Sequence, residues 1–447
     1  MNKGNVREAA LEILLSIEKN QAYSNLLLNK MIEKNSIKGK DIGLLTEIVY
    51  GTIQRRDVLD FYLAPFIKKQ KKLELWVTVL LRLSVYQMTF LDRVPDRAIF
   101  FEAVEIAKRR GHKGISSMVN GVLRTLQREG APSIKEITDP VKRLAIETSH
   151  PEWLVKRWVE QMGYEEAKKM CEINLIPPIQ TARVNLSRTT IEEVLTMLQE
   201  EGFDVERGDL SEDSVKTTGG NLVSSNAFKE GYITIQDESS MLVARALDVE
   251  QNHQVLDSCA APGGKTTHIA ELLKNSGQVI SLDLHEHKVK LINEQVSRLH
   301  LTNVKTFAMD SRKVEAQFER ESFDRILVDA PCSGFGVIRR KPDIKFAKKE
   351  TDIEKLASIQ LSILQAVSPL LKKGGILVYS TCTIDKEENT EIIDKFLSEN
   401  PDFEKDCKLN DRLPTRVHPY VKDGQLQIYP QYFETDGFYI ASLRKQV

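Results

Sequence analysis

The chain has 447 residues, of which 41% are hydrophobic and 28% are charged, and its formal net charge is −1. This length predicts two or three domains, each with a core of its own. No apolar run reaches the roughly 18 residues that a membrane span needs, and the N-terminal stretch MNKGNVREAALEILL carries charges where a signal peptide would be apolar, so we expect a cytoplasmic protein without membrane contact.

Five cysteines are scattered singly along the chain, with no CxxC pair. Zinc sites commonly use such pairs, and a disulfide framework needs an even set of cysteines. The pattern therefore predicts neither a metal site nor disulfide bonds. Each thiol is expected to be either a small buried side chain or a reactive group.

Residues 1–145 are predicted to form an all-helical bundle. Apolar residues recur at three- and four-residue spacing in VREAALEILLSIEK, DIGLLTEIVYGTIQRR, ELWVTVLLRLSVYQMTFL and AIFFEAVEIAKRR. Residues 1–140 carry 23 Lys and Arg against 16 Asp and Glu, a net charge of +7. This excess favours an anionic partner, although ordinary solvation of helix surfaces explains it equally well. The basic residues that we select as candidate phosphate contacts are Arg55, Arg56, Lys108, Arg109, Arg110 and Lys113.

The middle of the chain has a different pattern. Residues 131–151 contain the proline and serine turn signals of a linker. Residues 150–235 then mix helical patterns, such as EWLVKRWVEQMG and TIEEVLTMLQEEG, with the strand-like pieces TARVNL and YITI. We therefore expect a small α+β module at residues 150–235.

Short apolar runs alternate with helical segments over residues 236–447. The runs are QVLDSCA, QVISLDL, VKTFAMD, DRILVDAPC and GILVYSTCT. Alternation at this spacing predicts βαβ units and a parallel, doubly wound α/β sheet. Ligands of such sheets bind beyond the carboxyl ends of the strands, so the residues after each run form the candidate site.

The first run leads into the glycine loop CAAPGGKTT, residues 259–267. Gly263 and Gly264 permit close approach of the backbone to a ligand at the start of the next helix. A phosphate-binding P-loop is disfavoured because Cys259 stands where that motif requires glycine. A dinucleotide-binding fold is disfavoured because GxGxxG is absent.

Acidic residues end the second and third runs. Asp283 is placed to accept hydrogen bonds from ribose hydroxyls, and Asp310 can accept from an exocyclic amine such as that of adenine. Either residue alone is explained as a helix cap or a surface charge. The two together, beside a glycine loop, favour an adenosine-type cofactor.

Two cysteines follow the fourth and fifth runs, in Asp329-Ala-Pro-Cys332 and Ser380-Thr-Cys382. Both fall at carboxyl ends of strands that we expect to be neighbours. Cysteine is often buried for purely structural reasons, so a structural role is the alternative. Two thiols at equivalent strand ends of the expected cleft favour a functional role.

These motifs resemble two known families. Residues 236–447 resemble the Nol1/Nop2/Sun family of RNA cytosine-5 methyltransferases, through DSCAAPGGKTT, Asp283, Asp310, DAPCSG with RRKPD, YSTCT with KEEN, and DGFYIA. Residues 1–140 resemble the NusB-type RNA-binding domain, through VYGTIQRR, LLRLSVYQMTFLDRVP and VNGVLR. The resemblance implies a NusB-like bundle at residues 1–145, an RNA-binding extension at 150–235, and a Rossmann-like class I methyltransferase domain at 236–447.

The resemblance also implies a reaction and its residues. The methyl donor would be S-adenosylmethionine, and the methyl acceptor would be carbon 5 of cytosine 967 in 16S ribosomal RNA. Cys382 would be the nucleophile that adds to carbon 6, and Cys332 would assist release of the enzyme. Asp329 would contact the amide edge of the base, and Lys265 would supply positive charge. The implied cofactor-binding residues are Cys259, Ala260, Ala261, Pro262, Gly263, Gly264, Lys265, Asp283, Asp310 and Asp329.

Two other functions stay open at this point. The same chemistry could act on another RNA such as tRNA, because only the resemblance of the helical domain indicates ribosomal RNA. The chain could also be an RNA-binding assembly or antitermination factor with a silent methyltransferase domain, which the intact cysteine and aspartate motifs disfavour. We expect a monomer that binds 16S ribosomal RNA and needs no metal.

Overall fold

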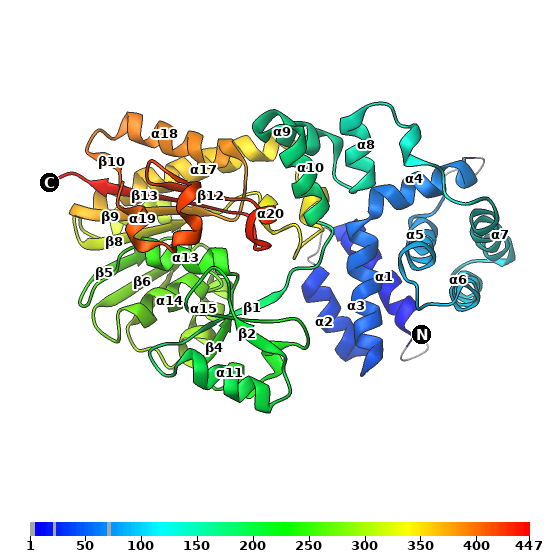
Figure 1. Ribbon diagram of the computed structural model, residues 1–447, viewed down its shortest axis with the longest axis horizontal. Helices are drawn as coiled ribbons and strands as arrows, with labels where there is room; N and C mark the ends of the chain where they lie inside the picture. The colour runs from blue at the N-terminus through cyan, green and yellow to red at the C-terminus, as the bar shows by residue number, and fades with distance from the viewer. Residues whose placement is uncertain (1–4, 21–23, 69–72) are drawn as a thin grey trace. The chain divides into compact units, whose positions relative to one another are not determined.

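The computed structural model describes residues 5–20, 24–68 and 73–447 (Figure 1). Residues 1–4, which begin the N-terminal stretch discussed above, lie outside the described residues. The chain divides into two compact units. One comprises Met1–Ile176 with Ile338–Lys348, and the other comprises Pro177–Val337 with Lys349–Val447.

The first unit is helical, as the apolar periodicity predicts. Its central helix, α5 (Leu75–Phe90), is apolar on nearly every side, and α1, α3, α4, α6 and α7 pack around it. The helices are α1 (Val6–Asn20), α2 (Ser24–Asn35), α3 (Lys40–Gln54), α4 (Arg56–Ile67), α6 (Asp96–Arg110), α7 (Lys113–Glu129), α8 (Pro140–Glu147), α9 (Glu152–Met162) and α10 (Tyr164–Ile173).

A short segment from the C-terminal half of the chain, Ile338–Lys348, packs within this helical unit. Its helix α16 (Ile344–Ala347) carries the fully buried Lys345, whose Nζ donates to the carbonyl oxygen of Gln54 at 2.8 Å. Gln54 ends α3, where carbonyls lack partners within the helix, so the lysine side chain caps that end. The guanidinium of Arg56 lies 3.5 Å from the ring centroid of Phe346 in the same segment.

A four-stranded antiparallel sheet begins the second unit, in the order β2-β3-β1-β4. Helix α11 (Ile191–Glu200) starts with a capping box between Thr190 and Glu193, and it packs on β2 and β3. The mixed helix and strand pattern of residues 150–235 predicted an α+β module; the sheet belongs to its later part, whereas α9 and α10 group with the helical unit. The strands are β1 (Gln180–Val184), β2 (Val205–Arg207), β3 (Ser214–Thr217) and β4 (Ile233–Ile235).

The larger sheet has nine strands, in the order β11-β12-β13-β9-β8-β5-β6-β7 with β10 beside β13. The predicted parallel strands are confirmed: β5 (Gln254–Asp257), β6 (Gln278–Asp283), β7 (Val304–Ala308), β8 (Phe323–Asp329) and β9 (Leu371–Thr381). The antiparallel strands, which were not predicted, are β10 (Phe403–Lys405), β11 (Val421–Lys422), β12 (Gln425–Ile428) and β13 (Phe438–Lys445).

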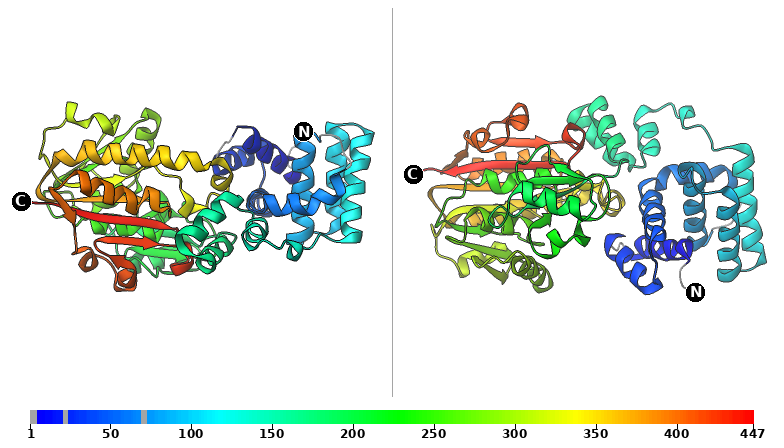
Figure 2. Two further views of the ribbon diagram at one scale, coloured as in Figure 1. Left: turned by 90° about the horizontal axis from the view of Figure 1, so that it is seen from above. Right: turned by 60° about the horizontal axis from the view of Figure 1, so that its bottom comes forward.

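Helices cover both faces of this sheet, and Figure 2 shows the long α17 in yellow running along it. Successive strand residues alternate between the two cores, so Leu256 packs with α17 and α18 while Val255 packs with α13 and α14. Burial on both faces explains the continuous apolar runs in the sequence. The helices are α13 (Glu238–Ala246), α14 (Gly264–Leu272), α15 (Glu286–Arg298), α17 (Glu350–Val367) and α18 (Thr390–Glu399).

Candidate active site

The glycine loop after β5 lies across the carboxyl ends of two strands. The amide of Ala260 donates to the carbonyl oxygen of Leu282 in β6 at 2.8 Å, and the chain then turns into α14. Gly263 makes that turn with φ of 107°, and a Cβ there would lie 3.2 Å from the Cα of Ile292. Only glycine adopts this conformation without strain. Gly264 has more room, since a Cβ there would lie 3.9 Å from its nearest neighbour.

The residues that precede the two glycines in this loop carry no charge. Cys259 and Ala261 are partly buried, and Pro262 is exposed. Burial raises the pKa of the Cys259 thiol, which keeps this cysteine protonated. Cys259 therefore has the character of a small neutral side chain and lacks the lowered pKa typical of a nucleophile.

Asp257, the last residue of β5, was not among the site residues predicted from the sequence. Its side chain is fully buried, and Oδ2 accepts a hydrogen bond from Thr266 Oγ1 at 2.6 Å. Its Oδ1 has no hydrogen-bond partner among the described residues. Burial raises the pKa of this carboxyl group to about 7. Its only sequence signal is its place in the motif DSCAAPGGKTT, beside the glycine loop.

Asp283 and Asp310 lie at the ends of β6 and β7, which pair in parallel. Asp283 Oδ1 accepts from the amide of His285 at 3.0 Å. Asp310 caps the 3₁₀ turn Ser311–Ala316, and two nitrogens of the Arg312 guanidinium donate to its carboxylate at 2.6 and 2.9 Å. This hydrogen bonding lowers the pKa of Asp310. The two predicted acidic residues thus occupy neighbouring strand ends.

Asp329, the last residue of β8, is held from two sides. Lys265 Nζ lies 2.8 Å from Oδ2, and Ser380 Oγ in β9 donates to Oδ1 at 2.9 Å. Burial alone would lower the pKa of Lys265, but the adjacent carboxylate raises it above its ordinary value. The same Nζ lies 5.0 Å from the ring centroid of Phe438. A fixed ammonium group is therefore present at these strand ends.

The two predicted cysteines meet at the ends of β8 and β9. The Sγ atoms of Cys332 and Cys382 are 3.4 Å apart, and neither cysteine forms a disulfide bond with another described residue. The hydrogen bond with Cys382, burial and nearby negative charges raise the pKa of Cys332 well above its ordinary value. Cys382, in contrast, interacts with Lys265 and contributes to the raised pKa of that lysine. The two thiols therefore have different electrostatic surroundings.

A buried polar cluster adjoins the two cysteine loops. Its centre is Glu388, from the KEEN segment, whose carboxylate accepts hydrogen bonds from the amide of Ser333 at 2.8 Å, from Ser333 Oγ, and from Gln360 Nε2 at 3.0 Å. Ser333 Oγ also lies 2.8 Å from Thr383 Oγ1. The sequence pattern assigned no role to Glu388, because it lies in a turn that follows no strand directly.

The basic residues selected in the helical unit mostly have partners of their own. Arg55 lies 4.2 Å from the ring centroid of Phe90, and burial lowers its pKa. Lys113, at the start of α7, is exposed. The ion pairs are Arg56–Asp57 (3.2 Å), Lys108–Glu105 (2.7 Å), Arg109–Glu8 (3.2 Å) and Arg110–Glu12.

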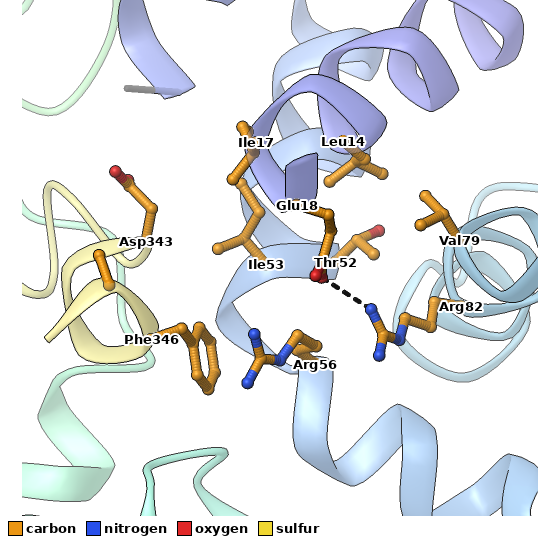
Figure 3. A pocket seen from close by; sticks show the side chains of 11 residues that line it. Leu14, Ile17, Glu18, Thr52, Ile53, Arg56, Val79, Arg82, Asp343 and Phe346 are labelled. Atoms are coloured by element: carbon orange, nitrogen blue, oxygen red, sulfur yellow. Dashed lines mark hydrogen bonds and ion pairs between the residues drawn. The ribbon is translucent and has the colours of Figure 1, made fainter. Parts of the chain in front are cut away.

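A cavity of about 120 Å³ lies within the helical unit (Figure 3). Arg56 and Arg82 line it, and Figure 3 shows the ring of Phe346 beside the Arg56 guanidinium. Arg82 is occupied by ion pairs with Glu18 at 2.8 Å and Asp60 at 2.7 Å. The cavity contains none of the strand-end residues, so it is not the candidate active site.

The strand ends thus carry the paired thiols of Cys332 and Cys382, several carboxylates and the ammonium group of Lys265. Within the described part of the chain, no three His, Cys, Asp or Glu side chains are grouped in a way that could hold a metal ion. No helix in residues 5–20, 24–68 and 73–447 is both long and apolar enough to cross a membrane.

Three family models match consecutive parts of the chain. Residues 4–128 match the NusB family, and residues 150–223 match the ferredoxin-like domain of RsmF/B-like methyltransferases. Residues 244–444 match the model described as 16S rRNA methyltransferase RsmB/F. The helical unit, the small antiparallel sheet and the larger sheet therefore each have a counterpart in a known family.

Similar proteins extend this result to the whole chain. The chain is 59% identical to the probable ribosomal RNA small subunit methyltransferase B of Bacillus subtilis (strain 168), over 100% of both chains. The crystal structure of PH0851 has a TM-score of 0.84 and 27% identity, over 98% of each chain. A methyltransferase homolog protein from Pyrococcus horikoshii has a TM-score of 0.58 and 29% identity, over 69% of this chain and 100% of that one. The chain therefore belongs to the RsmB/F family of 16S rRNA methyltransferases.

Proposed function

We propose that the protein transfers the methyl group of S-adenosylmethionine to carbon 5 of a cytosine in 16S ribosomal RNA, through a covalent bond between Cys382 and carbon 6. The observation that carries this proposal is the 3.4 Å distance between the sulfur atoms of Cys382 and Cys332, at the ends of adjacent parallel strands. Carbon 5 of cytosine is a poor nucleophile until another nucleophile has added to carbon 6. One thiolate for addition and a second thiol for release meet this need.

The ends of β5, β6 and β7 fit the methyl donor. Asp283 can accept hydrogen bonds from the ribose hydroxyls, and Asp310 can accept one from the adenine amine. Gly263 and Gly264 allow the backbone to approach the cofactor closely. Oδ1 of Asp257, which accepts no hydrogen bond from a residue that the structure describes, is a buried acceptor that the ammonium group of S-adenosylmethionine can satisfy. When bound, the cofactor supplies an electrophilic methyl group on a sulfonium centre.

Cys382 begins the reaction by adding its thiolate to carbon 6, which makes carbon 5 electron-rich enough to accept the methyl group. Lys265 places a positive charge near Cys382, which favours the thiolate. Carbon 5 then carries both a methyl group and a proton. Cys332 assists removal of that proton, the C5–C6 double bond forms again, and Cys382 leaves as a thiolate.

Asp329 is placed to hold the amide edge of the base. Its two oxygens accept hydrogen bonds from Ser380 and Lys265, and each oxygen can accept one more. A contact of this carboxylate with the base supports protonation of nitrogen 3 during addition. Lys265 then has two functions, because it orients Asp329 and favours the thiolate.

The substrate base must be unstacked, because carbon 6 cannot be reached within a stack. The match to the NusB family and the name of the Bacillus subtilis relative support ribosomal RNA over tRNA. The family resemblance supports cytosine 967 as the target. A protein acting on this RNA works in the cytoplasm, and we propose that it does so as a monomer.

The first experiment incubates wild type, Cys332→Ala and Cys382→Ala with S-adenosylmethionine and unmodified 16S ribosomal RNA fragments. Methyl transfer and protein–RNA adducts that survive denaturation are both measured. Cys382→Ala is expected to form neither product, because the nucleophile is missing. Cys332→Ala is expected to accumulate the adduct, because release fails.

The other outcomes are informative. If wild type transfers no methyl group and Cys332→Ala forms no adduct on any RNA, the methyltransferase proposal is wrong. The alternative function, an RNA-binding assembly or antitermination factor, is then favoured. If the adduct instead requires Cys332, the roles of the two cysteines are reversed. Transfer to tRNA fragments but not to 16S fragments would contradict the proposed substrate alone.

A further inference from the structure

Glu388 is a buried acid that the proposed reaction does not use. Its side chain is inaccessible to solvent, and burial raises its pKa above the ordinary value. Burying a carboxylate costs free energy that hydrogen bonds must offset, and a well-packed apolar side chain is often at least as stabilising. Stability alone therefore does not account for an acid at this position.

The hydrogen bonds of Glu388 lead to both sides of Cys332. Ser333, which follows Cys332, donates to the carboxylate through its amide at 2.8 Å and through its hydroxyl. Gln360 in α17 donates through Nε2 to Glu388 and to the carbonyl oxygen of Pro331, which precedes Cys332, both at 3.0 Å. Glu388 and Gln360 together hold the backbone before and after the thiol.

The same network reaches Cys382. Ser333 Oγ lies 2.8 Å from Oγ1 of Thr383, the residue after Cys382. The amide of Gly336 donates to the carbonyl oxygen of Cys382 at 2.9 Å, and a Cβ on Gly336 would lie 2.8 Å from that oxygen. The two cysteine loops are thus joined by one contact between side chains and one hydrogen bond between backbones, which restrains how far apart the loops can move.

The charges near the two cysteines also favour different roles for Cys332 and Cys382. Glu388 is one of the negative groups that raise the pKa of Cys332, whereas Lys265 interacts with Cys382. A thiol with a raised pKa is seldom ionised at neutral pH, so it is the poorer nucleophile. Once ionised it is the stronger base, which suits removal of the proton from carbon 5.

We propose that Glu388 is a positioning residue for release, which acts through Ser333 to hold Cys332 where it can take the proton from carbon 5. This inference rests on the proposed function. In the step concerned Cys332 acts as its thiolate, after its own proton has passed to solvent; the C5–H bond breaks and that proton passes to the thiolate sulfur. The electron pair forms the C5–C6 double bond, and the bond from carbon 6 to Cys382 breaks with sulfur leaving as a thiolate. Addition by Cys382 does not depend on Glu388.

The test follows single turnovers of wild type, Glu388→Ala and Glu388→Gln with S-adenosylmethionine and 16S ribosomal RNA fragments. Formation and decay of the denaturation-resistant adduct are measured over time. We expect normal formation in both variants and decay slowed by about 10- to 100-fold in Glu388→Ala, because a misplaced group loses its proton-transfer geometry. Glu388→Gln keeps one oxygen that can accept from the Ser333 amide, so its rate of adduct decay should lie between those of wild type and Glu388→Ala. The exposed Glu391 provides the matched control, since Glu391→Ala should release at the wild-type rate.

A double variant and a folding measurement make the result decisive. If Glu388 acts through Ser333, then Glu388→Ala combined with Ser333→Ala releases no more slowly than the slower single variant. Thermal unfolding and S-adenosylmethionine binding identify any variant that fails to fold, in which case Glu388→Gln still provides the test. Normal release without Glu388, additive slowing, or a folded, cofactor-binding variant that forms no adduct would each overturn the proposal. Absence of methyl transfer by wild type and of any adduct with Cys332→Ala would overturn the proposed function instead.

Discussion

Asp257 links the charge of the candidate site to the stability of the fold. Burial raises the pKa of its carboxyl group to about 7, whereas an exposed aspartate titrates near pH 4. Between about pH 4 and about pH 7 the folded protein therefore keeps a proton that the unfolded chain has released. Folding takes up this proton, so the contribution of Asp257 makes the free energy of unfolding fall as pH rises through this range, and above it the contribution is constant.

Asp257→Asn should remove this dependence, because the amide cannot ionise and still accepts a hydrogen bond from Thr266. The free energy of unfolding of the variant, relative to wild type, should rise by up to about 4 kcal/mol between about pH 4 and about pH 7. Chemical denaturation of both proteins across this range measures the difference. A difference that stays constant with pH would show that Asp257 is ionised in the fold.

At the scale of single residues, position along a strand was the useful signal. Asp283, Asp329 and Cys382 were predicted because each ends an apolar run, and parallel strands bring such ends to one edge. Glu388 could not be predicted this way, because it lies in a turn and reaches the site only through hydrogen bonds to Ser333 and Gln360. Such contacts between segments distant in sequence leave no local pattern.

The connection between β5 and α14 is the element in which the backbone itself forms part of the candidate site. Gly263→Ala should lower the free energy of unfolding by roughly 1–3 kcal/mol, because it places a Cβ at positive φ. Gly264→Ala should leave stability nearly unchanged, since its Cβ meets nothing closer than 3.9 Å. Thermal denaturation of the two variants distinguishes these effects.

The same pair of variants tests the cofactor site. If the backbone at Gly264 approaches S-adenosylmethionine, Gly264→Ala should weaken cofactor binding by about tenfold or more while the protein stays folded. Calorimetric titration with S-adenosylmethionine measures this affinity. Unchanged binding in Gly264→Ala would mean that the cofactor does not approach this part of the loop.

Elements with a long periodic pattern were mostly predictable and short ones mostly were not, although the eight-residue β13 was also missed. The parallel strands β5–β9 are buried on both faces, so their apolar runs stand out in the sequence. The antiparallel strands β10, β11 and β12 have three, two and four residues, which is too short for a recognisable alternation. The four-residue helix α16 was missed for the same reason. Its packing in the helical unit depends on tertiary contacts such as that of Lys345 with Gln54.

For the whole molecule, charge composition predicted a basic N-terminal region but not which cations are available to RNA. Arg109 and Arg110 pair with Glu8 and Glu12, whereas Lys113 is exposed. The net charge of a region counts paired and unpaired cations alike. Only the structure identifies Lys113 as the better candidate for phosphate contact.

Lys113→Ala should weaken binding of 16S ribosomal RNA fragments and reduce the slope of log affinity against log salt by about one. Arg110→Ala should mainly lower the melting temperature, because its ion pair joins α6 to α1. RNA affinity at several salt concentrations and thermal unfolding measure the two effects. Equal salt slopes for wild type and Lys113→Ala would exclude a phosphate contact at this position.

The covalent role of Cys382 is tested most directly by mapping the adduct. Cys332→Ala is incubated with S-adenosylmethionine and a 16S ribosomal RNA fragment, the denatured complex is digested with protease and nuclease, and the linked peptide is identified by mass spectrometry. The account predicts one modified peptide, with a methylated cytosine attached to Cys382. A nucleotide attached to any other residue, or methylated RNA produced by Cys382→Ala, would contradict it.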